Sequence, residues 1–292
     1  MNINMKNKNK TKIKKSLSEK IVLGIFFVII AAHATTFLYS FSWVFVNALK
    51  TTKVFEANPM GLPDPAVWYN FQDAFQRVSV EGVSFLSMLL NSVMLCALTT
   101  VMSVSANVLV AYPLARYRFP GRNIVYAMLI FVLTVPLYGG STIGYKLMSN
   151  LGMIDNPLLM CLNWFNGFAS NTLILYGCFQ VISQTYVEAG YLDGANDIQV
   201  FTKIMLPQAR PSIAAVAILG IIGQWSNYEM SLIYLPSYPN LALGIFLFED
   251  MVAVSKTVYF ASVCITMLPV LIVFACCQKT IMSNFSLGGI KG

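Results

Sequence analysis

The feature that most constrains the fold of this chain is a series of long stretches that carry almost no charge. A helix that crosses the hydrocarbon core of a bilayer needs about 20 consecutive apolar residues. Six stretches meet this requirement: 21–47, 82–115, 123–145, 156–187, 211–235, which contains one charged residue, Glu229, and 257–278. They predict an all-α membrane protein with six transmembrane helices.

The composition excludes a soluble globular protein. Only 11% of the 292 residues are charged and 57% are hydrophobic, whereas soluble domains carry about 25% charged residues. A transmembrane β-barrel would show alternating strands of about ten residues, and the unbroken apolar runs favour helices instead. The basic N-terminus followed by an apolar run resembles a secretory signal, but the run continues through Trp43 and Val46 and is long enough to span.

The distribution of Lys and Arg predicts the orientation. With six spans, both termini lie on one side, together with 14 of the 19 basic residues: Lys6, Lys8, Lys10, Lys12, Lys14, Lys15, Lys20, Arg116, Arg118, Arg122, Lys203, Arg210, Lys279 and Lys291. Basic residues are enriched on the cytoplasmic side, so we predict that both termini are cytoplasmic. The net charge of +7 then reflects topology and attraction to anionic membrane lipid, and we expect no nucleic-acid partner.

The sequence shows no catalytic or metal-binding pattern. It contains no glycine-rich phosphate loop, no H-E-x-x-H pair and no G-x-S-x-G elbow. The six cysteines lack C-x-x-C spacing and do not cluster with the single histidine, His33. We therefore expect a chain that is not an enzyme and holds no cofactor or metal. Any ATP that its function consumes would be bound by another subunit.

The stretch 184–211 between the fourth and fifth apolar windows has more local structure than a simple connector needs. Residues 185–191 favour a helix, and Asp193-Gly194 is typical of a tight turn. Asn196 followed by Gln199 matches a helix N-cap with its capping-box partner. The pattern predicts a helix, a sharp turn and a second short helix.

Two prolines suggest where the second short helix and the fifth span meet. We expect Pro207 to end the short helix and Pro211 to lie in the first turn of the fifth span. Two interpretations of the stretch remain open from the pattern alone. It is either a rigid projection for a cytoplasmic partner or an amphipathic loop packed against its own helices.

The residue string in this stretch resembles a known signature. Glu188-Ala189-Gly190, three residues, Gly194, nine residues and then Ile204-x-Leu206-Pro207 resembles the EAA-x3-G-x9-I-x-L-P motif of binding-protein-dependent ABC importer permeases. Gly190 departs from the second alanine that is usual there, and we expect this to weaken the first helix by up to about 1 kcal/mol. The six spans and the C-terminal string 286–292 also resemble the smaller permease subunit of the carbohydrate-uptake group, similar to the second maltose permease subunit.

The resemblance implies a permease subunit that forms half of a sugar pathway in a bacterial plasma (inner) membrane. Its implied partners are a second homologous permease, a cytoplasmic ATPase dimer that binds ATP and Mg²⁺, and an extracytoplasmic solute-binding protein. It also implies a basic tail at 1–20, a permease domain at 21–280 with a coupling loop at 184–210, and a cytoplasmic tail at 281–292. The residues implied in ATPase coupling are Glu188, Ala189, Gly190, Asp193, Gly194, Ile204, Leu206 and Pro207.

A polar and aromatic string in the fifth window is the candidate for contact with the transported substrate: Gln224, Trp225, Asn227, Tyr228 and Glu229. Aromatic faces stack on sugar rings, and amides and carboxylates bind hydroxyls. A carboxylate within the membrane is costly unless it faces a cavity or a partner. The alternative is a hydrogen-bonded cluster at the interface with the second permease.

Two further segments are predicted as exposed outer loops, 48–82 and 236–256, and both are candidates for docking the binding protein. Two other functions also remain open. A self-sufficient secondary transporter or channel would also have several spans, but we find no convincing internal repeat. An ABC permease for a solute other than a sugar would carry the same loop motif.

Overall fold

The computed structural model describes residues 16–135, 140–249 and 255–285, and these residues are helical with no strand. A single isolated β-bridge joins Val80 and Val83 within them. The predicted tail at 1–20 falls mostly outside the described residues, as does the string 286–292. An all-helical architecture is therefore confirmed for the part of the chain that the structure describes.

The helices follow one another along the chain in this order: α1 (Leu17–Ala48), α2 (Thr52–Ala57), α3 (Tyr69–Arg77), α4 (Phe85–Arg116), α5 (Arg122–Thr134), α6 (Gly140–Asn150), α7 (Pro157–Leu162), α8 (Ser170–Val181), α9 (Gln184–Leu192), α10 (Asp197–Gln199), the π-helix η1 (Val200–Met205), α11 (Leu206–Trp225), the π-helix η2 (Met230–Tyr234), α12 (Leu241–Glu249) and α13 (Lys256–Phe285).

Four helical stretches among the described residues are long and apolar enough to cross a membrane: Leu17–Ala48, Phe85–Arg116, Asp197–Trp225 and Lys256–Lys279. They correspond to four of the six predicted windows. The other two windows do not form single helices, because α5 is followed by a separate α6, and α7 and α8 are divided by residues 163–169. In this second break an Asn166 amide oxygen accepts a hydrogen bond from the backbone of Phe168 (2.9 Å), so a side chain replaces a helical partner.

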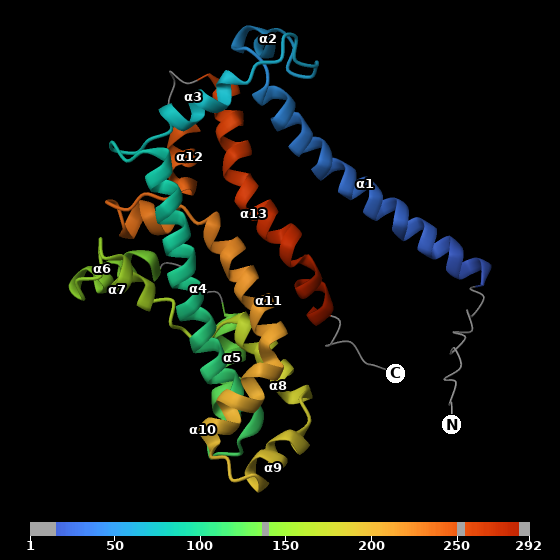
Figure 1. Ribbon diagram of the computed structural model, residues 1–292, viewed down its shortest axis with the longest axis vertical. Coiled ribbons are helices and arrows are strands. Elements are labelled where there is room, and N and C mark those ends of the chain that lie inside the picture. Colours follow the sequence, from blue (N-terminus) through green and yellow to red (C-terminus); the bar gives the residue numbers. More distant parts are fainter. Residues whose placement is uncertain (1–15, 136–139, 250–254, 286–292) are drawn as a thin grey trace, which may run out of the picture.

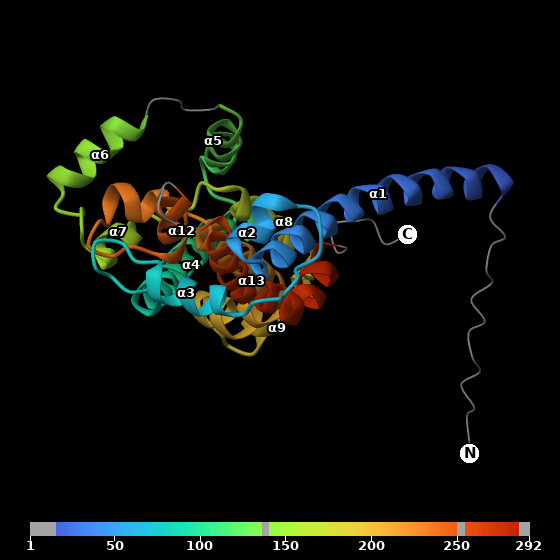
Figure 2. The ribbon, with the colours of Figure 1, turned by 90° about the horizontal axis from the view of Figure 1, so that it is seen from above.

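Helices α4 and α11 pack together as the centre of the molecule, and α8 packs against both of them. Figure 1 shows α2 and α3 at one end of this bundle and α9 and α10 at the other. Helix α1 contacts α13 near the α2 end and diverges from the bundle toward its own N-terminus. Viewed from above, α5 and α6 lie at one edge (Figure 2).

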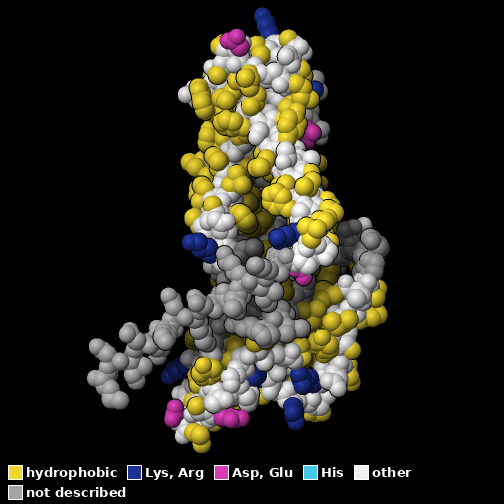
Figure 3. All heavy atoms as spheres, turned by 90° about the vertical axis from the view of Figure 1, so that its right-hand side faces the viewer, with side chains coloured by type: hydrophobic (Ala, Val, Ile, Leu, Met, Phe, Trp, Pro, Cys, Tyr) yellow, Lys and Arg dark blue, Asp and Glu magenta, His cyan; other side chains and the backbone are white. Residues whose placement is uncertain are grey.

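Much of the surface is apolar. The candidate membrane window of α1 has none of its residues buried, and many hydrophobic side chains lie on the upper half of the face in Figure 3. An apolar surface of this extent needs lipid or another subunit to cover it.

Three clusters of buried side chains hold the helices together. The α3–α13 cluster lies near the α2 end and includes Ala74, Phe85, Met88, Phe248 and Ala261. The α8–η1 cluster lies near the α9 end and includes Tyr112, Phe179, Val187, Val200 and Met205. A smaller α7–η2 cluster contains Leu95, Met160, Cys161, Met230 and Leu235. Helix α4 contributes to all three, so it connects the two ends of the molecule.

The expectations that Pro207 ends a short helix and that Pro211 lies in the first turn of the next helix are wrong, because Pro211 lies inside α11. Helices α10, η1 and α11 are continuous from Asp197 to Trp225, and Pro207 lies in the first turn of α11. A proline lacks the N–H that an α-helix interior requires. The preceding turn is a π-helix in which the N–H of Leu206 donates to the carbonyl of Phe201 five residues earlier, and this wider turn accommodates the missing donor.

The segment 236–256 also differs from the expected exposed loop. Helix α12 lies within it, and Leu241, Leu243, Gly244 and Phe248 are buried. Two hydrogen bonds fix its entrance to α4: the amide of Asn91 donates to the Pro239 carbonyl (3.0 Å), and the N–H of Leu241 donates to the Ser92 hydroxyl (2.9 Å). Apolar side chains in this short segment pack on the bundle instead of facing solvent.

The junction between α1 and α3 is fastened by two buried polar side chains. The Lys50 ammonium is fully buried and donates to the carbonyls of Asn58 (3.0 Å) and Pro59 (3.1 Å), and burial lowers the pKa of this lysine. The buried Asn70 amide donates to the carbonyls of Ala48 (2.7 Å) and Lys50 (2.8 Å). The segment after α1 is therefore held against α3 by hydrogen bonds to carbonyl groups that no helix satisfies.

We predict that Asn70→Ala destabilises this junction. The substitution leaves two buried carbonyl groups without their donor, which costs about 1–3 kcal/mol. The thermal unfolding temperature of the detergent-solubilised protein should fall, and cleavage by protease within 51–68 should become faster. Gln72→Ala, at an exposed position of the same helix, is the matched control. Equal behaviour of the two variants would contradict the fastening role of Asn70.

Candidate functional site

Helix α9 ends in a tight turn that only a few residue types can form. Its C-cap is Asp193, and Gly194 follows with a left-handed φ of +82°. The N–H of Ala195 donates to the Gly190 carbonyl (2.9 Å), and the N–H of Gly194 donates to the Tyr191 carbonyl (3.0 Å). These two bonds define a Schellman motif, which requires a left-handed residue after the C-cap. The glycine of the sequence motif therefore has a backbone role.

The second helix begins as its capping pattern predicts. The Asn196 amide oxygen accepts from the N–H of Gln199 (2.9 Å), and the Gln199 side chain accepts from the N–H of Asn196 (3.0 Å). Three residues thus separate the last residue of α9 from this N-cap. The predicted helix, sharp turn and second helix are confirmed in geometry. We call residues 184–210 the α9–α10 segment.

Gly190 allows the two helices of this segment to approach closely. A Cβ atom at this position would lie 2.5 Å from Cδ1 of Ile204 and 3.4 Å from Cγ2 of Val200. Gly190 is buried, as are Val187, Val200 and Met205 in the α8–η1 cluster. The motif residues Gly190 and Ile204 therefore contact each other inside the segment. Glycine at position 190, where the motif usually has alanine, leaves room for the Ile204 side chain.

The other motif residues lie at the exposed tip of the segment. Glu188, Ala189, Asp193 and Gly194 are all exposed, and the segment projects at the end of the bundle (Figure 1). Leu192 is 89% exposed and Ile198 is 72% exposed. Leu206 and Pro207 are half-buried at the start of α11. The motif thus divides into an exposed tip and an internal support.

The polar and aromatic string 224–229 does not lie on one surface. Trp225 is buried and its indole N–H donates to the Thr266 carbonyl of α13 (3.0 Å). Gln224 is also buried, whereas Asn227 and Tyr228 are half-buried and Glu229 is exposed. The string falls where α11 ends, between Trp225 and η2. The fifth window is therefore interrupted at the place where the sequence carries its polar residues.

The Asn227 and Tyr228 side chains are fixed by neighbours at this interruption. The amide oxygen of Asn227 accepts from the N–H of Met230 (3.2 Å), and its backbone carbonyl accepts from the Asn240 amide (2.7 Å). The ring of Tyr228 stacks on Phe246 of α12 with ring centres 4.2 Å apart. These contacts hold α12 beside the end of α11.

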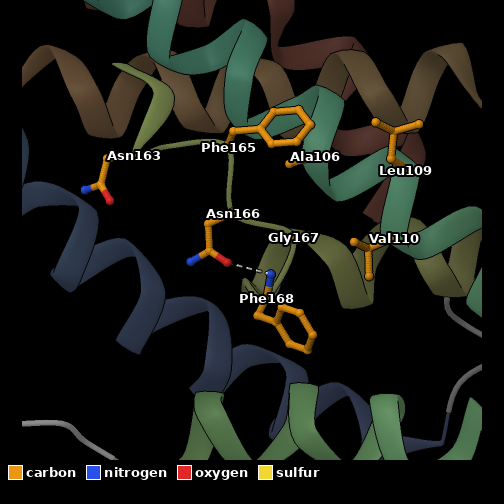
Figure 4. A pocket seen from close by; sticks show the side chains of 8 residues that line it. All are labelled: Ala106, Leu109, Val110, Asn163, Phe165, Asn166, Gly167 and Phe168. Carbon is orange, nitrogen blue, oxygen red and sulfur yellow. Dashed lines mark hydrogen bonds between the residues drawn. The ribbon is translucent and has the colours of Figure 1, made fainter. Parts of the chain in front are cut away.

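A pocket of about 460 Å³ lies between α4 and the break that divides α7 from α8 (Figure 4). Its lining combines two amides and two aromatic rings with aliphatic side chains: Ala106, Leu109, Val110, Asn163, Phe165, Asn166, Gly167 and Phe168. At Gly167 an added Cβ atom would lie 2.3 Å from Cγ2 of Val110 and 3.2 Å from the Ala106 carbonyl oxygen. The break is therefore held directly against the backbone of α4.

A buried polar cluster stabilises the same break from below the pocket. The Thr172 hydroxyl donates to the Gly167 carbonyl (2.6 Å) and lies 2.8 Å from the Asn107 amide oxygen. The Asn107 amide donates to the Ser103 hydroxyl (3.2 Å). Buried backbone groups outside a helix need other hydrogen-bond partners, and this cluster supplies some of them.

Residues 107–281 match the family model described as the binding-protein-dependent transport system inner membrane component. The chain belongs to this family. The matched region extends from the C-terminal part of α4 into α13, so it contains the α9–α10 segment, the three places where apolar windows are interrupted and the pocket wall formed by residues 163–168.

Similar proteins are transport permeases. The diacetylchitobiose uptake system permease protein NgcG of Streptomyces coelicolor is 29% identical over 275 residues, which cover 89% of this chain and 88% of that protein. The maltodextrin transport system permease protein MalD of Streptococcus pneumoniae is 26% identical over 295 residues, which cover 98% of each chain. A chain from the crystal structure of a bacterial ABC transporter involved in alginate import has a TM-score of 0.73 at 23% identity. The alignment with that chain covers 91% of this family member and 98% of the alginate transporter chain, and it shows an ABC importer permease fold.

Sequence reasoning missed two features of this family member. The pocket wall at residues 163–168 lies inside an apolar window, where the only local signals are Asn163 and the Asn166-Gly167 pair. A group of side chains between α4 and the α9–α10 segment was also missed. The group consists of Tyr117, Tyr191 and Asp197. Tyr117 is 80 residues from Asp197 in the sequence, and no local sequence pattern predicts a contact over this separation.

We predict that Gly190→Ala and Ile204→Val are coupled. Alanine raises the helix propensity of α9 by up to about 1 kcal/mol, but its Cβ collides with Cδ1 of Ile204, which valine lacks. The double variant should therefore be more stable than the sum of the single changes by about 0.5–1 kcal/mol. Thermal unfolding of the four proteins in one detergent checks this prediction, and additive changes would show that the Gly190–Ile204 contact carries no energetic constraint.

Proposed function

We propose that the chain is the transmembrane permease subunit of an ATP-driven importer and forms half of a pathway for a sugar or oligosaccharide. The observation that carries this proposal is the projecting α9–α10 segment. Its turn is fixed by a Schellman motif, its inner face is anchored in the α8–η1 cluster, and its tip exposes Leu192 and Ile198. Such a segment suits rigid-body transmission of movement from a partner.

The tip suits a protein partner because it combines exposed apolar and acidic side chains. Large exposed aliphatic groups beside polar residues are typical of interaction sites. Leu192 and Ile198 would enter a cleft on an ATPase subunit, with Glu188 and Asp193 at the rim. In this proposal the ATPase dimer binds ATP and Mg²⁺, and this chain holds neither.

Charge at the two ends of the bundle supports a cytoplasmic location for the α9–α10 segment. Arg116, Arg118 and Arg122 lie where α4 ends and α5 begins, and Lys203 lies in η1. This places them at the α9 end of the bundle (Figure 1). Basic residues favour the cytoplasmic side. We infer six crossings with both termini cytoplasmic, of which the third and fourth are interrupted helices.

The apolar surface and the helix interruptions support a second permease subunit. Helix α1 has no buried residue in its candidate membrane window, and the break at 163–169 exposes Asn163 and Asn166 beside the pocket. Polar side chains at membrane depth face a cavity or a partner. A homologous subunit facing this surface would enclose a shared pathway, and an extracytoplasmic binding protein would deliver the substrate to its outer end.

The sugar assignment rests on the relatives and on the chemistry of the pocket. Permeases for diacetylchitobiose and maltodextrin are similar along most of their length. The pocket combines amide groups, which bind hydroxyls, with the rings of Phe165 and Phe168, which present apolar faces. Its volume of about 460 Å³ falls in the range of small-molecule sites. We extend the predicted pathway to this pocket and retain Asn227, Tyr228 and Glu229 from the fifth window.

We predict that Gly194→Ala impairs attachment of the ATPase subunit, whereas Gly194→Asn impairs it less. No atom lies within 4 Å of the added Cβ, so the penalty of alanine comes from the left-handed backbone and amounts to about 1–2 kcal/mol. Asparagine adopts this conformation more readily. We expect recovery of the ATPase with the tagged permease, and sugar uptake, to fall roughly tenfold for alanine.

The paired substitution separates the possible outcomes. If both variants fail equally, the partner rejects any side chain at Gly194 and the turn conformation is not the requirement. If both retain the ATPase and normal uptake, the α9–α10 segment is not the coupling site. Recovery of the permease alone, with uptake in liposomes that lack ATP, would favour a self-sufficient transporter.

We predict that Asn163→Ala and Glu229→Gln each lower sugar uptake at limiting concentration by about two- to tenfold. This is the effect of losing one hydrogen bond of about 0.5–1.5 kcal/mol. Asn150→Ala, an exposed amide at the end of α6, is the control. Uptake of the radiolabelled substrate by membrane vesicles checks the prediction, and unchanged uptake in both variants would remove these residues from the pathway.

A further inference from the structure

We propose that Asp197 is a positioning residue that ties the α9–α10 segment to the end of α4 through two tyrosines. We call Tyr117, Tyr191 and Asp197 the tyrosine–aspartate brace. The inference rests on the proposed function and deepens it. It identifies the contact through which movement of the segment reaches α4 as well as α11.

One carboxylate oxygen joins three parts of the chain in the brace. The hydroxyl of Tyr191, on α9, donates to Oδ1 of Asp197 (2.5 Å). The hydroxyl of Tyr117, the C-cap of α4, donates to the same oxygen (3.5 Å). Asp197 is the first residue of α10. The carboxylate therefore sits between both helices of the segment and the end of α4.

The hydrogen bond between Tyr191 and Asp197 dominates the electrostatics of the brace. The hydrogen bond to the Asp197 carboxylate is the main cause that raises the pKa of Tyr191 to about 12. An ordinary tyrosine is also protonated at neutral pH, so this shift reflects the hydrogen bond that the phenol donates. A hydrogen bond to an ionised acceptor is shorter and stronger than one between neutral groups, which agrees with the short Tyr191 contact.

A second set of contacts fixes the same end of α4 to the start of α9. Arg116, the last residue of α4, donates to the Gln184 side chain (3.0 Å) and to the backbone carbonyl of Ile182. The Tyr112 ring packs against Phe201 of η1, with ring centres 4.7 Å apart, and against Tyr117, at 5.6 Å. The end of α4 is therefore held at the entrance of α9, at its C-terminal turn and at η1.

The position of the brace favours transmission of movement over stability. Tyr191 and Asp197 are exposed and Tyr117 is half-exposed, and hydrogen bonds open to water add little to folding stability. They still restrict how the exposed tip turns relative to α4. Without the brace, the tip would remain attached through η1, α11 and the Arg116 contacts, but the C-terminal turn of α9 would no longer be held to the end of α4.

Asp197 also lies in the first turn of α10, where a negative charge favours a helix N-terminus. A role confined to that helix predicts that removal of the tyrosine hydroxyls has no effect. Variants that keep the carboxylate and remove the hydroxyls therefore separate the two roles. Tyr186 offers a matched control, because it is an exposed tyrosine of the same helix that lies outside the brace.

The test uses the complete complex in liposomes, with the second permease, the ATPase dimer and the sugar-loaded binding protein. Sugar transported per ATP hydrolysed is measured for the unchanged chain, Asp197→Asn, the double variant Tyr117→Phe/Tyr191→Phe, Asp197→Glu and the control Tyr186→Phe. We expect the ratio to fall about fivefold in Asp197→Asn and in the double variant, at the lower end of typical coupling between sites. The ATPase should remain bound, Asp197→Glu should restore part of the ratio, and Tyr186→Phe should leave it unchanged.

Three results would overturn the inference. These are an unchanged ratio in the double variant, a proportional fall of transport and hydrolysis that leaves the ratio constant, and loss of the ATPase from the complex, which would indicate a structural role. Failure of the proposed function looks different, because the unchanged chain would then recover no ATPase and would show no transport driven by ATP. The two hypotheses are therefore tested by separate readouts of one experiment.

Discussion

The structure depends on the uninterrupted helix α4, whose 32 residues contribute to every buried cluster. At one end Phe85 and Met88 pack in the α3–α13 cluster, and at the other Tyr112 packs in the α8–η1 cluster. Between them Leu95 reaches the α7–η2 cluster. Several other apolar segments are interrupted, and the breaks at 163–169 and 226–229 have side-chain hydrogen-bond partners. The continuous helix α4 lies beside interrupted helices. It is a rigid element against which their polar breaks pack.

The elements that could be predicted from the sequence are those governed by local physics. The charge-free windows predict α1, α4, α11 and α13, because the length and apolarity of a membrane-spanning helix can be read directly from consecutive residues. The Asn196–Gln199 capping box and the turn at Gly194 are also local, since each depends on backbone groups within a few residues. The helix, turn and second helix of the α9–α10 segment were therefore predicted, but the π-helix η1 and the positions of Pro207 and Pro211 inside a continuous helix were not.

The features that could not be predicted depend on distant partners. Pro207 remains inside a helix because a π-helical turn before it supplies an alternative bonding pattern, and sequence rules assume an α-helical one. Helix α12 is buried because Asn91 and Ser92 of α4 bind its entrance, and those contacts join residues 148 and 149 apart. Lys50 is buried although lysine is rarely so, because two carbonyl groups beyond α2 accept hydrogen bonds from its ammonium group.

The continuity through Pro207 changes how the exposed tip is connected to the membrane part. The helix from Asp197 to Trp225 has 29 residues and extends about 40 Å, so the tip and the polar interruption at 226–229 are opposite ends of one rod. If Pro207 ended a separate helix, movement of the exposed tip would reach the bundle through a flexible connection between two helices. Because the helix is continuous, displacement of its Asp197 end would move the Asn227 region and the α12 helix that packs beside it, while the end of α4 is held to the same tip by Asp197. Two helices that reach different clusters thus share one point of attachment, and in the proposed importer this arrangement would convert a local push into relative movement of the pathway walls.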